Sequence, residues 1–281
     1  MLRPRHWRIF GVDFTSRPRA RKPITIAIGH LGARNFALEG IEEHCAWESY
    51  ETWLLRPGPW VAGFDFPFGL PREAVTDLAW PQTYPELVNH CRKLGREEFR
   101  AMLDRYRESR PAGNRYAHRV TDLPARSHSP LKLVNPPVGL MFLEGAPRLL
   151  DAGLSIPGLL DGDPARLAFE AYPGFTARGI FRGSYKNDSV SKQTPARRRA
   201  RKLIVESLTA AANPFGFALH APPPLLASLV RDATGDRLDA VICAMQAGWT
   251  LQRREENYGL PRDIDPLEGW ILMVPEAKID E

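Results

Sequence analysis

Two segments, residues 7–15 and 60–66, are apolar at consecutive positions rather than at alternating ones. Successive side chains of an extended strand point to opposite faces, so a strand of this kind is buried on both faces. Such strands lie at the centre of a sheet that helices cover on each side. A chain of 281 residues is long enough to bury about 75% of its unfolded surface. The pattern therefore predicts an α/β fold.

The other expected elements follow from periodicity and from start and stop signals. They are, in order, a strand at 24–28 that forms a hairpin with the first, a strand at 35–38, a helix at 41–55, the strand at 60–66, a helix at 84–109, a strand at 167–172, a helix from Pro195 to about Ala212 capped by Thr194, a short helix at 222–231 and a helix from about Gly235 through Trp249. This order predicts a mixed sheet, antiparallel over its first three strands and parallel afterwards, with helices on both faces.

The proline-rich middle of the chain interrupts this order. The chain contains 26 prolines, and residues 111–164 show no sustained period. Length alone would allow about two domains. Because regular structure resumes after the proline-rich stretch, we expect a single domain over 1–281, with 71–163 as an insertion or lid over the core.

Composition excludes several classes of protein. No apolar run approaches the roughly 18 residues needed to span a membrane, and the first residues lack the apolar region of a secretory signal. The three cysteines are far apart and odd in number, which argues against a disulfide framework and favours the reducing cytoplasm. A formal charge of +5 favours an anionic partner only weakly.

An isolated acid ends three of the predicted strands: Asp13, Asp65 and Glu170. A glycine or alanine lies two positions before each acid, on the same strand face, and leaves space for another element or an ion. Taken alone, each acid is more simply explained as a turn cap or the partner of an arginine. Several buried carboxylates together cost several kcal/mol per charge unless cations compensate them. Mg²⁺ prefers such oxygen ligands.

The last predicted helix adds two further acids. Asp236 and Asp239 are spaced i and i+3, so they share one face of its first turn. Asp236 is most simply explained as a helix cap. Asp239 opens the apolar stretch 240–245, so we expect it to face the sheet.

These residues carry a resemblance to a known family. The strings Gly-Val-Asp at 11–13, Gly-Phe-Asp-Phe-Pro-Phe-Gly-Leu-Pro at 63–71, Phe-Glu-Ala-Tyr-Pro at 169–173 and Asp-Arg-Leu-Asp-Ala at 236–240 resemble domain-of-unknown-function family 429. Its members are described as predicted nucleases of the ribonuclease H-like fold. The ordered blocks extend from about residue 9 to 250, and the Asp-x-Pro-x-Gly-x-Pro string is the most specific of them.

The resemblance implies a metal-dependent nuclease that hydrolyses phosphodiester bonds of DNA or RNA. The implied metal ligands are Asp13, Asp65, Asp236 and Asp239, and the implied catalytic residues are Asp13, Asp65, Glu170 and Asp239. Two Mg²⁺ or Mn²⁺ ions would be held there. One would lower the pKa of an attacking water, and the other would stabilise the leaving oxygen.

Basic residues supply candidate contacts to nucleic acid. Residues 186–202 are rich in lysine and arginine, a pattern that is more often a solvated face. Arginines at a helix N-terminus repel the helix dipole, however, which favours a nearby anion. The predicted nucleic-acid-binding residues are Lys192, Arg197, Arg198, Arg201 and, from the loop 115–128, Arg119.

Two other functions compete with the nuclease. A non-catalytic nucleic-acid-binding or scaffold protein of the same fold would bind nucleic acid equally well with metal chelated. A sugar-kinase or actin-like protein would use residues 11–15 as a phosphate loop. That architecture needs a second glycine-rich loop late in the chain, which the sequence lacks, so this alternative is the weakest.

Overall fold

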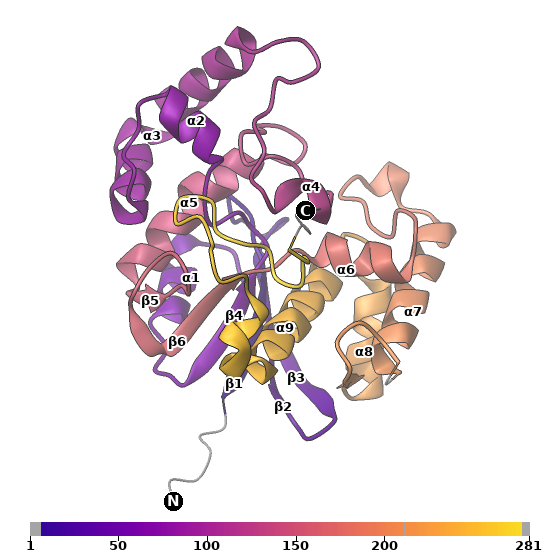
Figure 1. Cartoon of the computed structure of the whole chain (residues 1–281). Coiled ribbons are helices and arrows are strands. Elements are labelled where there is room, and N and C mark those ends of the chain that lie inside the picture. Colours follow the sequence, from indigo (N-terminus) through magenta and orange to yellow (C-terminus); the bar gives the residue numbers. More distant parts are fainter. Residues whose placement is uncertain (1–6, 211, 277–281) are drawn as a thin grey trace, which may run out of the picture.

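A seven-stranded mixed sheet forms the centre of the protein, with the strand order β5-β6-β4-β1-β2-β3-β7. The computed structural model describes residues 7–210 and 212–276 (Figure 1). The strands are β1 (Arg8–Asp13), β2 (Ile24–Leu31), β3 (Asn35–His44), β4 (Trp60–Phe64), β5 (Leu154–Ser155), β6 (Asp163–Glu170) and β7 (Ala218–His220). Of these strands, β2 alone runs opposite to its neighbours. The predicted α/β fold is confirmed, with three antiparallel strands followed by parallel ones.

The central strands are buried on both faces, as the consecutive apolar residues predicted. In β1, Ile9 packs into one apolar cluster and the next residue, Phe10, into the other. In β4, Val61 and Ala62 divide in the same way. The alternation defines two faces of the sheet, which we call the Ile9 face and the Phe10 face.

Helices cover each face (Figure 1). The Ile9 face carries α9 (Asp236–Gln252), with α6 (Pro173–Ile180), α7 (Pro195–Thr209) and α8 (Pro223–Arg231) around it. The Phe10 face carries α1 (Trp47–Leu54) and α5 (Val138–Asp151), with α2 (Arg72–Asp77) and α3 (Tyr84–Ser109) packed beyond them. The short helix α4 (Asp122–Ala125) and the 3₁₀ helices η1 (Val190–Lys192) and η2 (Arg254–Gly259) lie in connections.

Helix α9 lies directly on the sheet because two glycines leave room for it. Gly11 and Gly63 are partners on the neighbouring strands β1 and β4. A Cβ atom on Gly11 would lie 2.0 Å from the carbonyl oxygen of Ala240, and one on Gly63 would lie 2.5 Å from the carbonyl oxygen of Cys243. Gly11 and Gly63, each two positions before an aspartate, therefore let the backbone of α9 pack directly on the sheet.

Several element boundaries differ from the predicted ones. Residues 41–44 continue β3, because Ile41 pairs with Ala27 in the ladder with β2, and α1 begins only at Trp47. The prediction of a helix over 41–55 was therefore wrong in its first part. Helix α7 is capped by the Thr194 side chain, as predicted, and ends at Thr209 rather than near Ala212; residue 211 lies outside the described residues.

The middle of the chain contains more regular structure than its composition indicated. Helix α5 occupies part of the stretch 111–164 that shows no sustained period, and it contributes Phe142 and Leu149 to the apolar cluster of the Phe10 face. Helix α3 has its predicted bounds, with a break at Gly95, whose φ is 70°. No helix of the described residues is both long and apolar enough to cross a membrane.

Candidate metal centre

Asp13 ends β1 and Asp65 directly follows the neighbouring parallel strand β4, so both lie at the same edge of the sheet. Val12 is the partner of Phe64, and the backbone N–H of Asp65 donates to the carbonyl oxygen of Val12 at 2.9 Å. Asp13 lies two positions after Gly11 and Asp65 two positions after Gly63, so both belong to the Ile9 face. They therefore point toward the first turn of α9.

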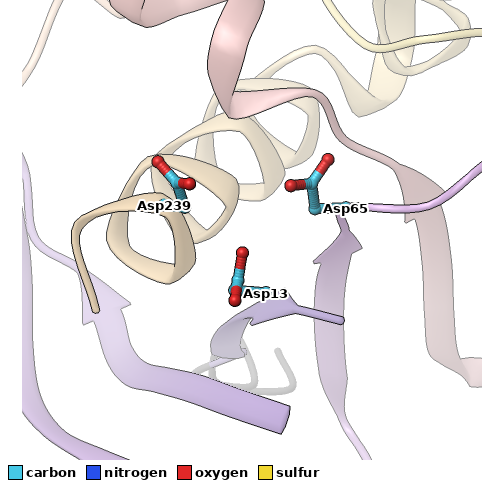
Figure 2. A group of neighbouring side chains, drawn as sticks. All are labelled: Asp13, Asp65 and Asp239. Carbon is cyan, nitrogen blue, oxygen red and sulfur yellow. The ribbon is translucent and has the colours of Figure 1, made fainter. Parts of the chain in front are cut away.

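Asp239 completes a cluster of three carboxylates from β1, β4 and α9 (Figure 2). One carboxylate oxygen from each of Asp13, Asp65 and Asp239 lies within 4.8 Å of the other two. Asp13 is 5% exposed and Asp239 is 0% exposed. The convergence of Asp13, Asp65 and Asp239, which a shared metal site requires, is thus confirmed, although Asp13 and Asp239 are more than two hundred positions apart in sequence.

The cluster holds its negative charge in an environment that disfavours it. Burial raises the pKa of Asp13 well above its ordinary value, and the nearby carboxylate of Asp236 raises it further. Burial raises the pKa of Asp65 to about 7, against the opposing attraction of Lys186. The Oδ2 atom of Asp13 is buried and has no hydrogen-bond partner among the described residues. A buried oxygen left without a partner is costly unless a cation or water satisfies it.

Two lysines compensate part of the negative charge of the carboxylates. The sequence did not indicate that either lysine would contact these acids. The Nζ atom of Lys186 contacts Asp239, and the hydroxyl of Tyr185 donates to the other oxygen of Asp239 at 2.6 Å. Lys22, from the loop between β1 and β2, donates to Asp236 at 2.6 Å. Burial lowers the pKa of Lys22, but the attraction of Asp13 and Asp236 outweighs it and raises the pKa overall. The Asp236 carboxylate thus pairs with Lys22 and stands outside the triad.

Glu170, by contrast, lies on the Phe10 face. It is the ladder partner of Phe64, one position before Asp65, and the alternation of a strand therefore turns it away from the triad. Its carboxylate accepts two hydrogen bonds of 2.7 Å from Arg119 and one of 2.9 Å from the backbone N–H of Phe68. The structure thus joins Glu170 to a guanidinium group and not to the three aspartates.

Arg119 ties a long loop to the sheet through this pair. It is 2% exposed and also donates to Asp122 at 2.9 Å. Breaking a buried pair of this kind by removing one partner costs about 3–5 kcal/mol. Arg119 therefore fixes the loop after α3 beside the end of β6.

The other predicted nucleic-acid-binding residues lie around η1 and the start of α7. Lys192 and Arg198 are exposed, and Arg197 is half-buried and donates to the Ser184 hydroxyl at 3.0 Å. Arg201 is 3% exposed, and it donates to the carbonyl oxygens of Val230 at 3.0 Å and Tyr185 at 2.6 Å. Arg201 therefore holds the backbone of Tyr185, whose hydroxyl donates to Asp239.

A cavity of about 720 Å³ lies beside the triad. Asp13 and Asp65 line it, together with Lys22, Lys186 and Tyr185. Further walls come from residues 127–128, 135–138, 170–174 and 183–188. A substrate in this cavity would contact both the carboxylates and the lysines.

The residues at the bottom of the cavity suit a hard divalent ion. The triad offers carboxylate oxygens, the ligands that Mg²⁺ and Mn²⁺ prefer. Asp13 Oδ2 supplies an oxygen that no described group uses. The cluster could therefore hold a metal ion through Asp13, Asp65 and Asp239.

Comparison with known proteins adds no relative to this description. No protein-family model matches the sequence, and no curated protein and no solved structure matches it significantly. The likeness to the ribonuclease H-like fold rests on the strand order, the strand directions and the positions of the three aspartates. The topology of the sheet and the acidic cluster are therefore consistent with that fold.

We expect divalent-metal affinity to rise with pH from about pH 5.5 through about pH 7. The folded-state pKa of Asp65 is about 7, whereas an aspartate in an unfolded chain titrates near 3.9. The folded protein therefore holds an extra proton between these values, and a metal must displace it. Calorimetric titration with Mg²⁺ from about pH 5.5 to about pH 8 should give affinities that increase with pH by up to about tenfold per pH unit for each carboxyl proton that the metal displaces. The raised pKa of Asp13 adds such a proton to that of Asp65. Affinity that is constant below pH 7 would contradict the assignment of Asp65 as a ligand.

The same shift predicts how the metal-free protein responds to pH. Because the pKa of Asp65 is raised on folding, this group's contribution to stability falls as pH rises from about 4 to about 7 and is constant above that. Saturating Mg²⁺ should reverse the loss at neutral pH, since it binds the deprotonated form.

Replacing Lys186 by methionine should lower the melting temperature of the metal-free protein. The substitution keeps an unbranched side chain, one atom shorter, but removes the ammonium group from Asp239, which is fully buried. Added Mg²⁺ should raise the melting temperature more in this variant than in the wild type, because the ion no longer competes with a lysine. Lys202→Met, at an exposed position in α7, is the matched control and should melt like the wild type. Equal metal-induced shifts in Lys186→Met and wild type would show that Lys186 does not compensate the cluster.

Proposed function

We propose that this protein is a Mg²⁺- or Mn²⁺-dependent nuclease, related to domain-of-unknown-function family 429, that hydrolyses phosphodiester bonds of DNA or RNA. The observation that supports this most is the meeting of Asp13, Asp65 and Asp239 at one end of a ribonuclease H-like sheet. Buried carboxylates without full compensation are costly, and proteins keep them chiefly where they do chemistry.

The metal supplies Lewis-acid chemistry when bound, polarising a phosphoryl oxygen and activating water. Asp13, Asp65 and Asp239 would hold it, and Tyr185 fixes the orientation of Asp239 through its hydroxyl. Lys22 and Lys186 add positive charge at the edge of the cavity, where they can attract the phosphate oxygens of a substrate. In this proposal Glu170 pairs with Arg119 and holds the cavity wall in place. It does not bind the metal.

Nucleic acid would approach over η1 and the start of α7. Lys192 and Arg198 are exposed there, and Arg197 is partly so. Arg119 and Arg201 already donate to protein oxygens and are buried, so in this proposal they position the site and do not contact phosphate. Binding through exposed basic residues should weaken as salt increases.

The proposal places the protein in the cytoplasm. All three cysteines are free thiols, and Cys45 is exposed. Exposed, unpaired thiols persist where the compartment is reducing.

A non-catalytic nucleic-acid-binding protein is the second candidate. The contact of the Lys186 ammonium group with Asp239 and the pairing of Lys22 with Asp236 favour this candidate, because they compensate part of the negative charge without a metal. The two candidates differ in what chelation does. A nuclease loses activity without divalent ions, whereas a scaffold binds nucleic acid unchanged.

The test is a cleavage assay on DNA and RNA oligonucleotides with Mg²⁺ or Mn²⁺, and with a chelator. We expect metal-dependent cleavage that Asp239→Asn abolishes while its fold, checked by circular dichroism, is retained. Absence of cleavage of every substrate at millimolar Mn²⁺, with nucleic acid still bound, would replace the nuclease by the scaffold. Cleavage that persists in Asp239→Asn would indicate a contaminating enzyme and would remove the support for the proposal.

A further inference from the structure

Two aspartates of the cluster, Asp13 and Asp65, lie in the wall of a cavity rather than on a flat face. Residues 135–138 and 127–128 wall it on the side of the long middle segment, and residues 183–188 wall it on the side of α7. The stretch 170–174 at the end of β6, and residues 14–16 with Lys22 after β1, close the remaining sides. A substrate must enter between these segments to reach the aspartates.

The depth of the aspartates restricts what can reach them. Asp239 is 0% exposed, Asp13 is 5% exposed and Asp65 is half-buried. Tyr185 and Lys186 lie against Asp239. In a duplex each phosphate joins neighbouring sugars of its own strand, and pairing and stacking hold that strand in the helix. To bring such a phosphate between the walls of the cavity, the backbone must leave the duplex, which costs a few kcal/mol for unpairing and unstacking.

The size of the cavity agrees with a thin substrate. Its volume of about 720 Å³ is in the range that encloses one compact organic ligand, or about one or two nucleotide units. A turn of duplex is far larger than this.

From this enclosure we propose that the substrate is single-stranded nucleic acid, which enters the cavity without the need to unpair. The inference rests on the proposed nuclease function for its chemistry, but the strand preference is a property of the cavity and can be measured by binding alone.

Tyr172 is an aromatic side chain of the cavity wall that can stack on a base of that strand. It lines the cavity two residues after the end of β6 and is half-buried. The guanidinium group of Arg178 lies 5.0 Å from the centre of its ring and donates to its hydroxyl at 3.2 Å, which fixes the ring. Aromatic rings held in this way stack on bases of any identity.

The test compares circular single-stranded DNA with relaxed circular duplex DNA, since neither has ends, and includes single-stranded and duplex RNA as parallel arms. With Mg²⁺ or Mn²⁺, we expect single strands to be cleaved at least about tenfold faster than duplexes of the same nucleic acid. Comparable rates on the two forms would overturn the inference while leaving the nuclease intact.

Binding separates this inference from the proposed function. Fluorescence anisotropy with labelled strands and duplexes, with and without a chelator, should show at least about tenfold tighter binding of single strands. If nothing is cleaved, the nuclease proposal fails. The relative affinity for single strands and duplexes then decides whether the preference for single strands holds. Equal affinity for the two forms would then overturn it.

Variants at Tyr172 test the stacking contact. Tyr172→Leu should weaken single-strand binding roughly tenfold, whereas Tyr172→Phe, which keeps the ring, should bind within about twofold of the wild type. Melting temperatures of both variants check that they are folded. Loss of binding in both variants, or in neither, would show that base stacking on Tyr172 does not contribute.

Discussion

Asp13→Asn is expected to abolish divalent-metal binding and, at the same time, to raise the melting temperature of the metal-free protein. The amide replaces a carboxylate whose pKa is raised by burial and by Asp236, so the substitution removes a charge that folding disfavours. Each kcal/mol gained should add roughly 2–4 °C. Loss of a direct ligand should reduce metal affinity by more than the ~10–100-fold typical of residues that only support a ligand.

Calorimetry and thermal unfolding measure the two effects separately. Asp161→Asn, at an exposed aspartate away from the cavity, is the matched control and should change neither quantity. Gain of stability together with loss of metal binding is the signature of a residue kept for function. An Asp13→Asn protein that binds Mg²⁺ like the wild type would remove Asp13 from the site, and one that melts earlier would show that its carboxylate stabilises the fold.

Gly11→Ala is expected to be strongly destabilising, although it adds one methyl group. That methyl group would lie 2.0 Å from backbone atoms of both Ala240 and Ala244, which have no side-chain freedom with which to yield. Helix α9 must move off β1, at a cost of about 3 kcal/mol. Because Asp239 is in the first turn of α9, metal affinity should fall as well.

Gly40→Ala on β3 is the control for Gly11→Ala. A Cβ atom at Gly40 has no neighbour within 4 Å, so the free energy of unfolding should change by less than about 1 kcal/mol. Denaturant unfolding of the two variants gives the comparison. If Gly11→Ala unfolds like Gly40→Ala, helix α9 does not depend on contact with the backbone of β1.

Local periodicity was enough to predict the central part of the fold and of the site. Consecutive apolar residues identified β1 and β4, and the small residue two positions before each acid indicated that another element could approach the sheet beside Asp13 and Asp65, where α9 lies. The run of apolar residues after Asp239 indicated that it faces the sheet, and it is fully buried there. Each of these signals is contained within a few residues of sequence.

What escaped prediction depends on register and on long-range contacts. Glu170 has the same local signature as Asp65, yet it pairs with Phe64, and that one-residue offset places it on the other face. Lys186 resembled the other basic residues of its segment, and nothing near it in sequence indicates that it reaches Asp239. The edge strand β7 spans three residues, too few to show a period.

The glycine contact between α9 and the sheet has a consequence for when the site comes into existence. The three aspartates are brought together by backbone atoms in direct contact, and the last of them comes from a helix that ends at residue 252. A chain still being synthesised therefore has no assembled centre until that helix has left the ribosome and docked. The hydrolytic activity proposed for this centre would therefore begin only once that helix has docked, late in biogenesis.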